Sequence, residues 1–133
     1  MRIEPGAVVL VNFPFTDLQS SIVRPALVLT QKRDDVIIVG IFSKVPPYLQ
    51  DSWIIIDEGD PGFKQTGLKK LSVIKTEKIA VVHQSLIRKE LGRLSPELMQ
   101  KVKPKYSVKL LGLTNLLLQP YPSFSNLHFF RNS

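Results

Sequence analysis

Residues 6–30, GAVVLVNFPFTDLQSSIVRPALVLT, decide how the rest of this 133-residue chain is organised. An apolar run at 8–11 leads into the cluster FPF at 13–15, and a second apolar run at 26–29 follows a polar loop. Apolar and β-branched runs of this length, separated by polar residues, are typical of strands. The stretch therefore predicts two β-strands joined by a loop.

Arg24 is the only charged residue at the start of the second strand, and Pro25 restricts it to an extended conformation. An unpaired guanidinium group is costly to bury, so this side chain must face water or meet an anion. Two interpretations stay open on the residues alone. Arg24 is either a strand-edge arginine paired with an acid such as Asp17, or a group that binds an anionic ligand.

Length and composition predict one domain, because 133 residues with 44% hydrophobic content suffice for one core. The absence of cysteine excludes disulfides and thiolate metal sites. No apolar run reaches the roughly 18 residues of a membrane span, and the N-terminal run is too short for a signal peptide. We expect a cytoplasmic protein that does not bind membranes.

The net charge of +7 is distributed unevenly along the chain. Residues 1–63 carry 5 Lys and Arg against 8 Asp and Glu, whereas residues 64–109 carry 12 against 3. A basic half of this kind suits a polyanion such as RNA or an acidic protein partner. A solvated, lysine-rich face that serves solubility is the alternative.

Beyond the opening hairpin, several short apolar runs predict further strands. The run VIIVGIF reads as a strand buried on both faces, and a glycine-rich and acidic loop at 57–62 closes the next strand. The segment 85–94 is ambiguous between strand and helix. Five or six short strands before a late helix favour a mainly β fold, a small and strongly bent antiparallel barrel. The predicted strands after the hairpin are 36–42, 53–56, 68–75 and 79–82.

The helix signal begins at Ser95-Pro96-Glu97, with serine as N-cap, proline in the first turn and an acid beside it. Apolar residues every four positions predict one buried stripe. Pro104 falls inside this pattern and predicts a kink or an early end near Lys103. Residues 114–133 have no period and little charge, which predicts a poorly ordered appended tail. The stripe consists of Leu98, Val102, Tyr106 and Leu110.

The spacing of Gly6, the apolar run at 8–11, FPFTD at 13–17 and RPALVL at 24–29 resembles the opening of the MazF/PemK family of toxins of type II toxin-antitoxin pairs. Weaker landmarks follow, among them Leu91-Gly92-Arg93-Leu94-Ser95. The resemblance implies an SH3-like antiparallel barrel with a C-terminal helix, as in MazF and CcdB, over a toxin domain at 1–113. It also implies a homodimer.

The resemblance further implies an endoribonuclease that needs no metal or other cofactor and cleaves single-stranded RNA, such as mRNA, at selected sequences. In that family an arginine in the RPALVL segment and a threonine or serine at the end of the third strand form the active site. By position these are Arg24 and Ser43. The implied products carry a 2′,3′-cyclic phosphate and a 5′-hydroxyl.

A further set of residues is expected to contact the RNA. The loop 16–23 resembles the flexible segment that covers the RNA groove in the family. An aromatic ring can stack on a base, and lysines can contact phosphates; an aromatic residue in the core and lysines on a solvated surface are the alternatives. The candidates are Phe15, Thr16, Asp17, Ser20, Lys44, Lys70 and Lys75, with Lys69 beside them.

Other chemistries have less support in the sequence. His83 follows the predicted strand at 79–82 and His128 lies in the predicted tail, so the sequence gives no reason for the two imidazoles to meet as a pair for acid-base catalysis. The acidic loop at 57–60 reads as a turn, so no metal site is predicted. There is no glycine-rich phosphate loop of the kind that nucleotide hydrolysis uses.

The resemblance leaves two other functions open. One is a CcdB-like toxin that poisons DNA gyrase, and the other is an attenuated member that binds only antitoxin or nucleic acid. In each case we expect a cognate acidic antitoxin that is partly disordered before it binds the basic half. Binding to operator DNA is expected only for the toxin-antitoxin complex.

Overall fold

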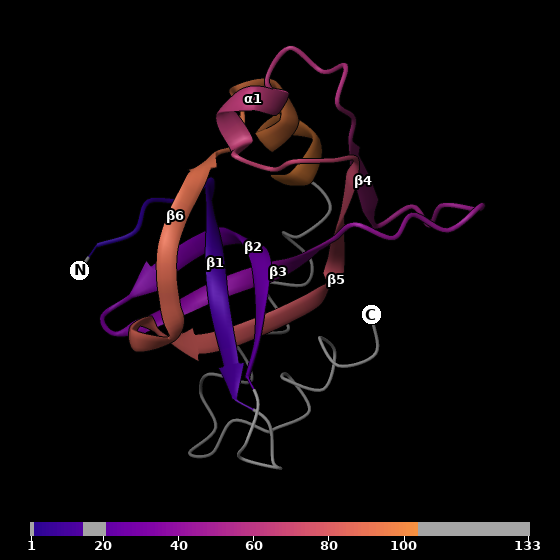
Figure 1. The fold of residues 1–133 in the computed structure, drawn as a ribbon. Helices are drawn as coiled ribbons and strands as arrows, with labels where there is room; N and C mark the ends of the chain where they lie inside the picture. Colours follow the sequence, from indigo (N-terminus) through magenta and orange to yellow (C-terminus); the bar gives the residue numbers. More distant parts are fainter. Residues whose placement is uncertain (1, 15–20, 104–133) are drawn as a thin grey trace.

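The computed structural model describes residues 2–14 and 21–103. These residues form a mainly β fold in which two short helical segments and a further helical segment at 96–103 accompany the strands (Figure 1). The strands are β1 (Ala7–Pro14), β2 (Ser21–Lys32), β3 (Asp35–Phe42), β4 (Trp53–Ile56), β5 (Ser72–His83) and β6 (Ile87–Arg93), and the short helical segments are α1 (Phe63–Thr66) and the 3-10 turn η1 (Gln84–Leu86).

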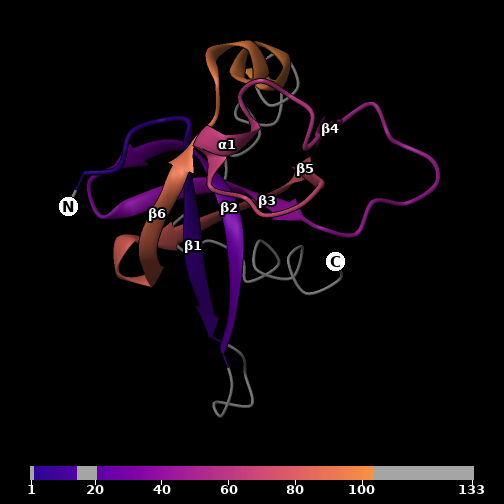
Figure 2. The ribbon, with the colours of Figure 1, turned by 45° about the horizontal axis from the view of Figure 1, so that its top comes forward.

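The strands pair in the order β4-β5-β3-β2-β1-β6, and each pair is antiparallel. Figures 1 and 2 show that the sheet curves strongly, so that β1 and β6 run across the direction of β3 and β5. The predicted bent antiparallel architecture is confirmed. Within the described residues, no helix has the length and apolarity needed to cross a bilayer.

Both faces of the sheet are buried, because the apolar strands alternate their side chains between two hydrophobic clusters. Val9 and Val11 of β1 belong to the first cluster, and Val8 belongs to the second. In β3, seven of the eight residues are buried, as expected for a strand covered on both faces. The helical segment at 96–103 covers the second cluster through Leu98 and Val102.

Ser95 caps that helical segment as predicted. Its hydroxyl oxygen accepts a hydrogen bond from the backbone N–H of Leu98 at 3.2 Å, and its carbonyl accepts one from Met99 at 2.9 Å. The outcome predicted for Pro104 and the tail at 114–133 lies outside the described residues, as do Tyr106 and Leu110 of the predicted stripe.

Three segments differ from the sequence-based expectation. Residues 68–71 are not part of a strand, and 72–83 form one continuous strand where two were predicted. The ambiguous segment 85–94 contains the end of η1 and then β6. The short helix α1 was not expected, since it has only four residues and too little sequence to show a helical period.

β5 is one continuous strand with a three-residue bulge in its pairing with β3. Lys75 pairs with Gly40 and Ile79 pairs with Val39, so residues 76–78 have no counterpart on β3. Thr76 anchors the bulge to the start of β4, because its N–H and its hydroxyl both donate to the Ser52 carbonyl, at 3.2 and 2.7 Å. The polar run that reads as a strand break is thus held by hydrogen bonds.

Two glycines allow α1 to lie directly against β6. Gly67 ends α1 with φ of +75°, and a Cβ atom there would lie 2.2 Å from the Leu91 carbonyl oxygen. A Cβ atom at Gly92 would lie 2.1 Å from the Gln65 carbonyl oxygen. Only glycine permits backbones to approach this closely.

Candidate active site

Arg24 lies near the start of β2, opposite Val11 of β1. Side chains alternate along a strand, so Arg24 shares a face with Ala26 and Val28, which belong to the first cluster. The side chain is half-buried, and its guanidinium carbon lies 5.8 Å from the centre of the Phe42 ring. Arg24 therefore lies on the ring of a residue at the end of β3.

Ser43 follows Phe42 directly, at a bend where β3 has ended. The last pair between β2 and β3 joins Ala26 to Gly40, so beyond it the start of β2 and the end of β3 no longer pair with each other; β2 pairs there with β1, and β3 pairs with β5. Ser43 is exposed at this position. Strand pairing thus brings Arg24 and Ser43, 19 positions apart in the sequence, to one end of the sheet.

A pocket of about 470 Å³ lies at this end of the sheet, and both Arg24 and Ser43 line it. Five of its lining residues are cationic and, within the described part of the chain, none is acidic. Five positive charges gathered in one pocket favour an anionic ligand. The cations are Arg24, Lys44, Lys69, Lys70 and Lys75, and the other lining residues are Ile22, Val23, Pro25, Ile41, Phe42, Ser43, Leu68 and Ser72.

Lys75 is the most enclosed lysine of this pocket. Its ammonium nitrogen lies 4.8 Å from the centre of the Phe42 ring and 4.6 Å from that of Trp53, and the side chain is half-buried. Burial lowers the pKa of Lys75 below its usual value of 10.5, and the charge of Lys78 lowers it further, while Glu77 acts in the opposite direction. Lys75 is therefore a cation held by aromatic faces.

Glu77, in the bulge of β5, holds Trp53 in place. One carboxylate oxygen accepts a hydrogen bond from the indole N–H of Trp53, and the other accepts one from the Ser52 hydroxyl at 2.6 Å. Trp53 pairs with Lys75 across β4 and β5. The bulge therefore positions the aromatic ring against which Lys75 lies, in keeping with the role of bulges in aiming side chains.

The predicted contact residues fall into two groups. Lys44, Lys70 and Lys75 line the pocket together with Lys69. The other predicted contact residues, Phe15, Thr16, Asp17 and Ser20, lie outside the described residues, as does the predicted alternative pairing of Arg24 with Asp17. Whether these residues bind RNA stays a prediction.

Sequence reasoning missed the aromatic part of the site. Phe42 and Trp53 were expected only as strand residues, and Glu77 was not considered. The available signal for an aromatic site was the single tryptophan of the sequence, Trp53. It lies two residues before Ile55, on the same face of β4. Nothing in the linear sequence brings that tryptophan next to Lys75.

The described residues also include the acidic loop and one of the two histidines considered from the sequence. The acidic loop is a turn, in which the Asp60 carboxylate accepts from the Asp57 N–H at 2.9 Å. The His83 ring accepts from the Ser85 N–H at 3.1 Å where η1 begins, and His128 lies outside the described residues. In the described ranges, no three His, Cys, Asp or Glu side chains gather as a metal ion would need.

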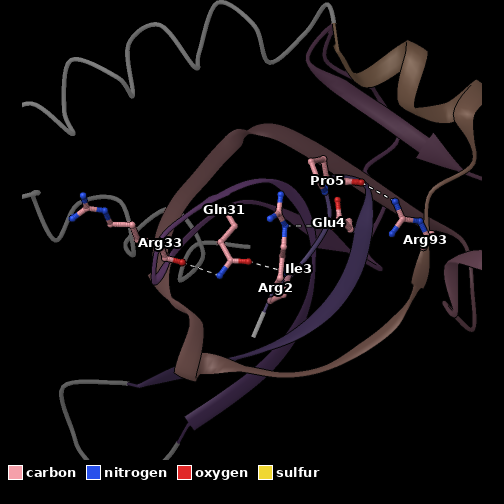
Figure 3. A network of polar contacts seen from close by, with 7 residues as sticks. All are labelled: Arg2, Ile3, Glu4, Pro5, Gln31, Arg33 and Arg93. Atoms are coloured by element: carbon pink, nitrogen blue, oxygen red, sulfur yellow. Dashed lines mark hydrogen bonds and ion pairs between the residues drawn. The ribbon is translucent and has the colours of Figure 1, made fainter.

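A second hollow, of about 400 Å³, lies at the other end of β2, beside the N-terminal segment. Figure 3 shows that Gln31, in this hollow, and Arg93, beside it, bind backbone atoms of this segment and of the hairpin that follows β2. The Gln31 side chain accepts from the Ile3 N–H at 2.7 Å and donates to the Arg33 carbonyl at 2.9 Å, while Arg93 donates to the Pro5 carbonyl at 3.0 Å. These contacts tie the N-terminal segment to the sheet.

Most of this chain matches one family of known proteins. The sequence model of the family described as PemK-like, MazF-like toxin of type II toxin-antitoxin system matches residues 4–107. The chain belongs to this family. The resemblance seen in the opening hairpin is confirmed, and the chain is a MazF-like toxin of a toxin-antitoxin system. A search of curated protein sequences gave no match.

Solved structures share the fold of this MazF-like toxin at low sequence identity. An endoribonuclease from a mycobacterial species is 16% identical with a TM-score of 0.60, over 92% of this chain and 97% of that chain. The MazE-MazF structure from Deinococcus radiodurans contains a chain that is 18% identical with a TM-score of 0.64, over 84% and 97%. A mycobacterial endoribonuclease in complex with its cognate antitoxin is 17% identical with a TM-score of 0.59, over 81% and 94%.

Proposed function

We propose that this toxin is an endoribonuclease that cleaves single-stranded RNA at selected sequences without a metal ion. The observation that carries the proposal is that Arg24 and Ser43 line one pocket with four lysines. The fold is also that of proteins described as endoribonucleases. The toxin domain is taken as 1–113 and residues 114–133 as an appended tail.

Cleavage follows from what RNA supplies and what the pocket adds. The 2′-oxygen of the RNA gives up its proton and forms a bond to the adjacent phosphorus, and negative charge accumulates on the phosphorane oxygens. The bond from phosphorus to the 5′-oxygen then breaks, and Arg24 relays a proton to that oxygen. Arg24 presents a planar fork of N–H donors to two of these oxygens, and the Ser43 hydroxyl donates to the same group. Preorganised donors of this kind are usually the largest contribution to catalysis. The products carry a 2′,3′-cyclic phosphate and a 5′-hydroxyl.

The remaining lining residues bind the strand on either side of the cut. Lys44, Lys69 and Lys70 contact flanking phosphates, which makes binding sensitive to salt. Ile22 and Val23 are exposed beside Arg24 and offer apolar surface to bases. Because these two residues carry no charge, selectivity depends on base contacts more than on phosphate contacts at this rim. Phe15, Thr16, Asp17 and Ser20 complete the substrate contacts in this proposal.

An acidic antitoxin that folds as it binds is the partner proposed for the basic surface, and the toxin acts in the cytoplasm as a homodimer. Structures of similar fold include complexes with an antitoxin. Operator DNA is bound only by the toxin-antitoxin complex. Acidic segments bind such surfaces through long-range attraction, and their ordering reduces the affinity for a given contact area.

The test is cleavage of mixed-sequence RNA by the purified toxin with a chelator present. We expect cleavage at a short shared sequence, a loss of about 10²-fold or more in Arg24→Ala, and only partial recovery in Arg24→Lys, which keeps the charge and loses the fork. Arg88→Ala is the matched control, because Arg88 is exposed on β6 and does not line the pocket.

Three outcomes contradict the proposal. Undiminished cleavage by Arg24→Ala removes Arg24 from the mechanism. Cleavage that stops with the chelator and returns with a divalent ion contradicts metal independence. A wild-type toxin that leaves RNA intact and traps gyrase on cleaved DNA belongs to the CcdB-like class of function.

A further inference from the structure

The main chain of Pro25 faces β3. In an antiparallel sheet the main-chain groups of successive residues point alternately to the two neighbouring strands. The Val28 carbonyl accepts a hydrogen bond from the Gly6 N–H at 2.9 Å, so the main-chain groups of Val28 point to β1. Pro25 lies three positions earlier, and the register of β2 is regular between the two residues. The nitrogen and the carbonyl of Pro25 therefore point to the other neighbour, β3.

Pro25 ends the pairing between β2 and β3 because it lacks a donor. The last pair joins Ala26 to Gly40, so the next position in register sets Pro25 opposite Ile41. In a regular ladder these two residues would exchange two hydrogen bonds. Proline has no N–H and cannot donate to the Ile41 carbonyl. The ladder stops at this residue for that reason.

The Ile41 carbonyl is directed to the pocket that holds Arg24. Ile41 and Pro25 both line this pocket. The Ile41 side chain packs in the second hydrophobic cluster, and the residue is only 2% exposed. Because Pro25 provides no N–H, the donor for this carbonyl on the β2 side must come from water or from the ligand. A buried carbonyl without a donor is costly, so a ligand that supplies one is favoured.

The surroundings of this carbonyl suit a nucleotide base. Arg24 comes directly before Pro25, a rise of about 3.3 Å along the strand, so a phosphodiester bound by Arg24 lies beside the acceptor. Ile22 and Val23, which are 39% and 36% exposed, add apolar surface to the same pocket. Bases present an apolar face to such surface and carry N–H donors on their edges.

We propose that the Ile41 carbonyl selects a base beside the scissile phosphate by accepting a hydrogen bond from its Watson–Crick edge, and that Pro25 is the positioning residue that leaves this carbonyl to the RNA. The inference rests on the proposed RNA cleavage and names a source of its sequence selectivity. A base that lacks the N–H leaves the carbonyl unpaired inside the pocket. The cost of an unpaired buried acceptor corresponds to a loss of about 10- to 10²-fold in cleavage rate.

The test combines a change in the protein with a change in the RNA, so that their coupling is measured. A single-stranded oligoribonucleotide spans a cleavage site mapped on total RNA. The bases beside the cut are replaced one at a time by analogues that lack an edge N–H: purine for adenine, 2-pyrimidinone for cytosine, hypoxanthine for guanine and N3-methyluracil for uracil. We expect one analogue to lower cleavage by the wild-type toxin about tenfold or more.

Pro25→Ala and Pro25→Val restore the N–H that can donate to the Ile41 carbonyl, and valine also favours the extended strand. In both variants we expect the natural base and that analogue to be cleaved at rates within about threefold of each other. Pro61→Ala is the control, because Pro61 is exposed and does not line the pocket, and it should keep the discrimination of the wild type.

Hydrogen exchange gives a readout that does not depend on RNA. In both variants the new amide at position 25 should exchange slowly, as a ladder amide does, and rapid exchange overturns the role of Pro25. Equal losses on natural and analogue RNA in the variants overturn base selection by the carbonyl and leave the proposed nuclease standing. So does a wild-type toxin that is indifferent to every analogue but is slowed when the 2′-hydroxyl of the nucleotide after the cut is replaced by hydrogen. A wild-type toxin that cleaves no RNA overturns both proposals.

Discussion

The contact between α1 and β6 gives a sharp prediction, because the substitution Gly92→Ala adds a single methyl group where there is no room. The added carbon would lie 2.1 Å from the Gln65 carbonyl oxygen and 2.6 Å from the Thr66 carbonyl carbon. Favourable contacts lie at about 3.5–4 Å, so the backbones must separate by more than about 1 Å. Both neighbours are backbone atoms, which cannot turn away as a side chain would.

The surroundings oppose such a separation. The Thr66 side chain is fully buried, its hydroxyl donates to the Phe63 carbonyl at 2.6 Å, and it accepts from the Leu68 N–H at 3.1 Å. Overpacking costs about 1–3 kcal/mol and occasionally more. Replacing glycine restricts the unfolded chain and returns up to about 1 kcal/mol. We expect a net loss of about 2 kcal/mol, a factor of roughly 30 in the folding equilibrium.

The assay is urea unfolding followed by the fluorescence of Trp53, the only tryptophan, at one fixed protein concentration. Gly59→Ala is the matched control, because its Cβ atom would have only the Asp57 carboxylate nearby, at 3.9 Å. The expected result is a lower midpoint for Gly92→Ala at unchanged slope and no loss for the control. A Gly92→Ala variant as stable as the wild type would refute the reasoning.

Three other predictions address separate features of the chain. Ser95→Ala removes the hydroxyl that accepts from the Leu98 N–H and should cost about 1 kcal/mol of unfolding free energy, measured by urea titration. Arg33→Gly relieves a residue held at φ of +55° in the β2–β3 turn and should raise the unfolding free energy by about 0.5 kcal/mol, measured by urea titration. The gain is small because glycine also adds conformational freedom to the unfolded chain. The pKa of Lys75 is lower in the folded state than its usual 10.5. At a pH between the folded-state pKa and 10.5, the unfolded state therefore binds more protons than the folded state. Stability relative to Lys75→Met should therefore rise as the pH approaches 10.5, as followed by circular dichroism in urea at several pH values, and a flat difference would contradict the burial of the charged group.

Local patterns in the sequence predicted much of the architecture. The β-branched run at 36–42 predicted a strand covered on both faces, and Ser95-Pro96 predicted the start of a helix, because in each case a few adjacent residues determine the outcome. β5 was predicted as two strands, since the polar run after Lys75 resembles a break. Its continuity depends on hydrogen bonds from Thr76 to Ser52, 24 positions away in the sequence.

The candidate site was predictable only where a local motif marks a residue. The motif RPALVL singled out Arg24, and the end of the third strand singled out Ser43. The enclosure of Lys75 by Phe42 and Trp53 depends on the order β4-β5-β3, which no single segment specifies. The aromatic part of the site, Phe42 and Trp53, therefore depends on long-range strand pairing and could not be predicted from local sequence patterns.

The central strand β3 limits where this protein can change. It is paired on both edges and packed on both faces, so substitutions between Val36 and Phe42 disturb neighbours on every side. Ser43, one residue beyond its end, is exposed and free of that constraint. Evolution can thus exchange the pocket residue at position 43, or move its hydroxyl by a position, while the fold that forms the pocket stays intact.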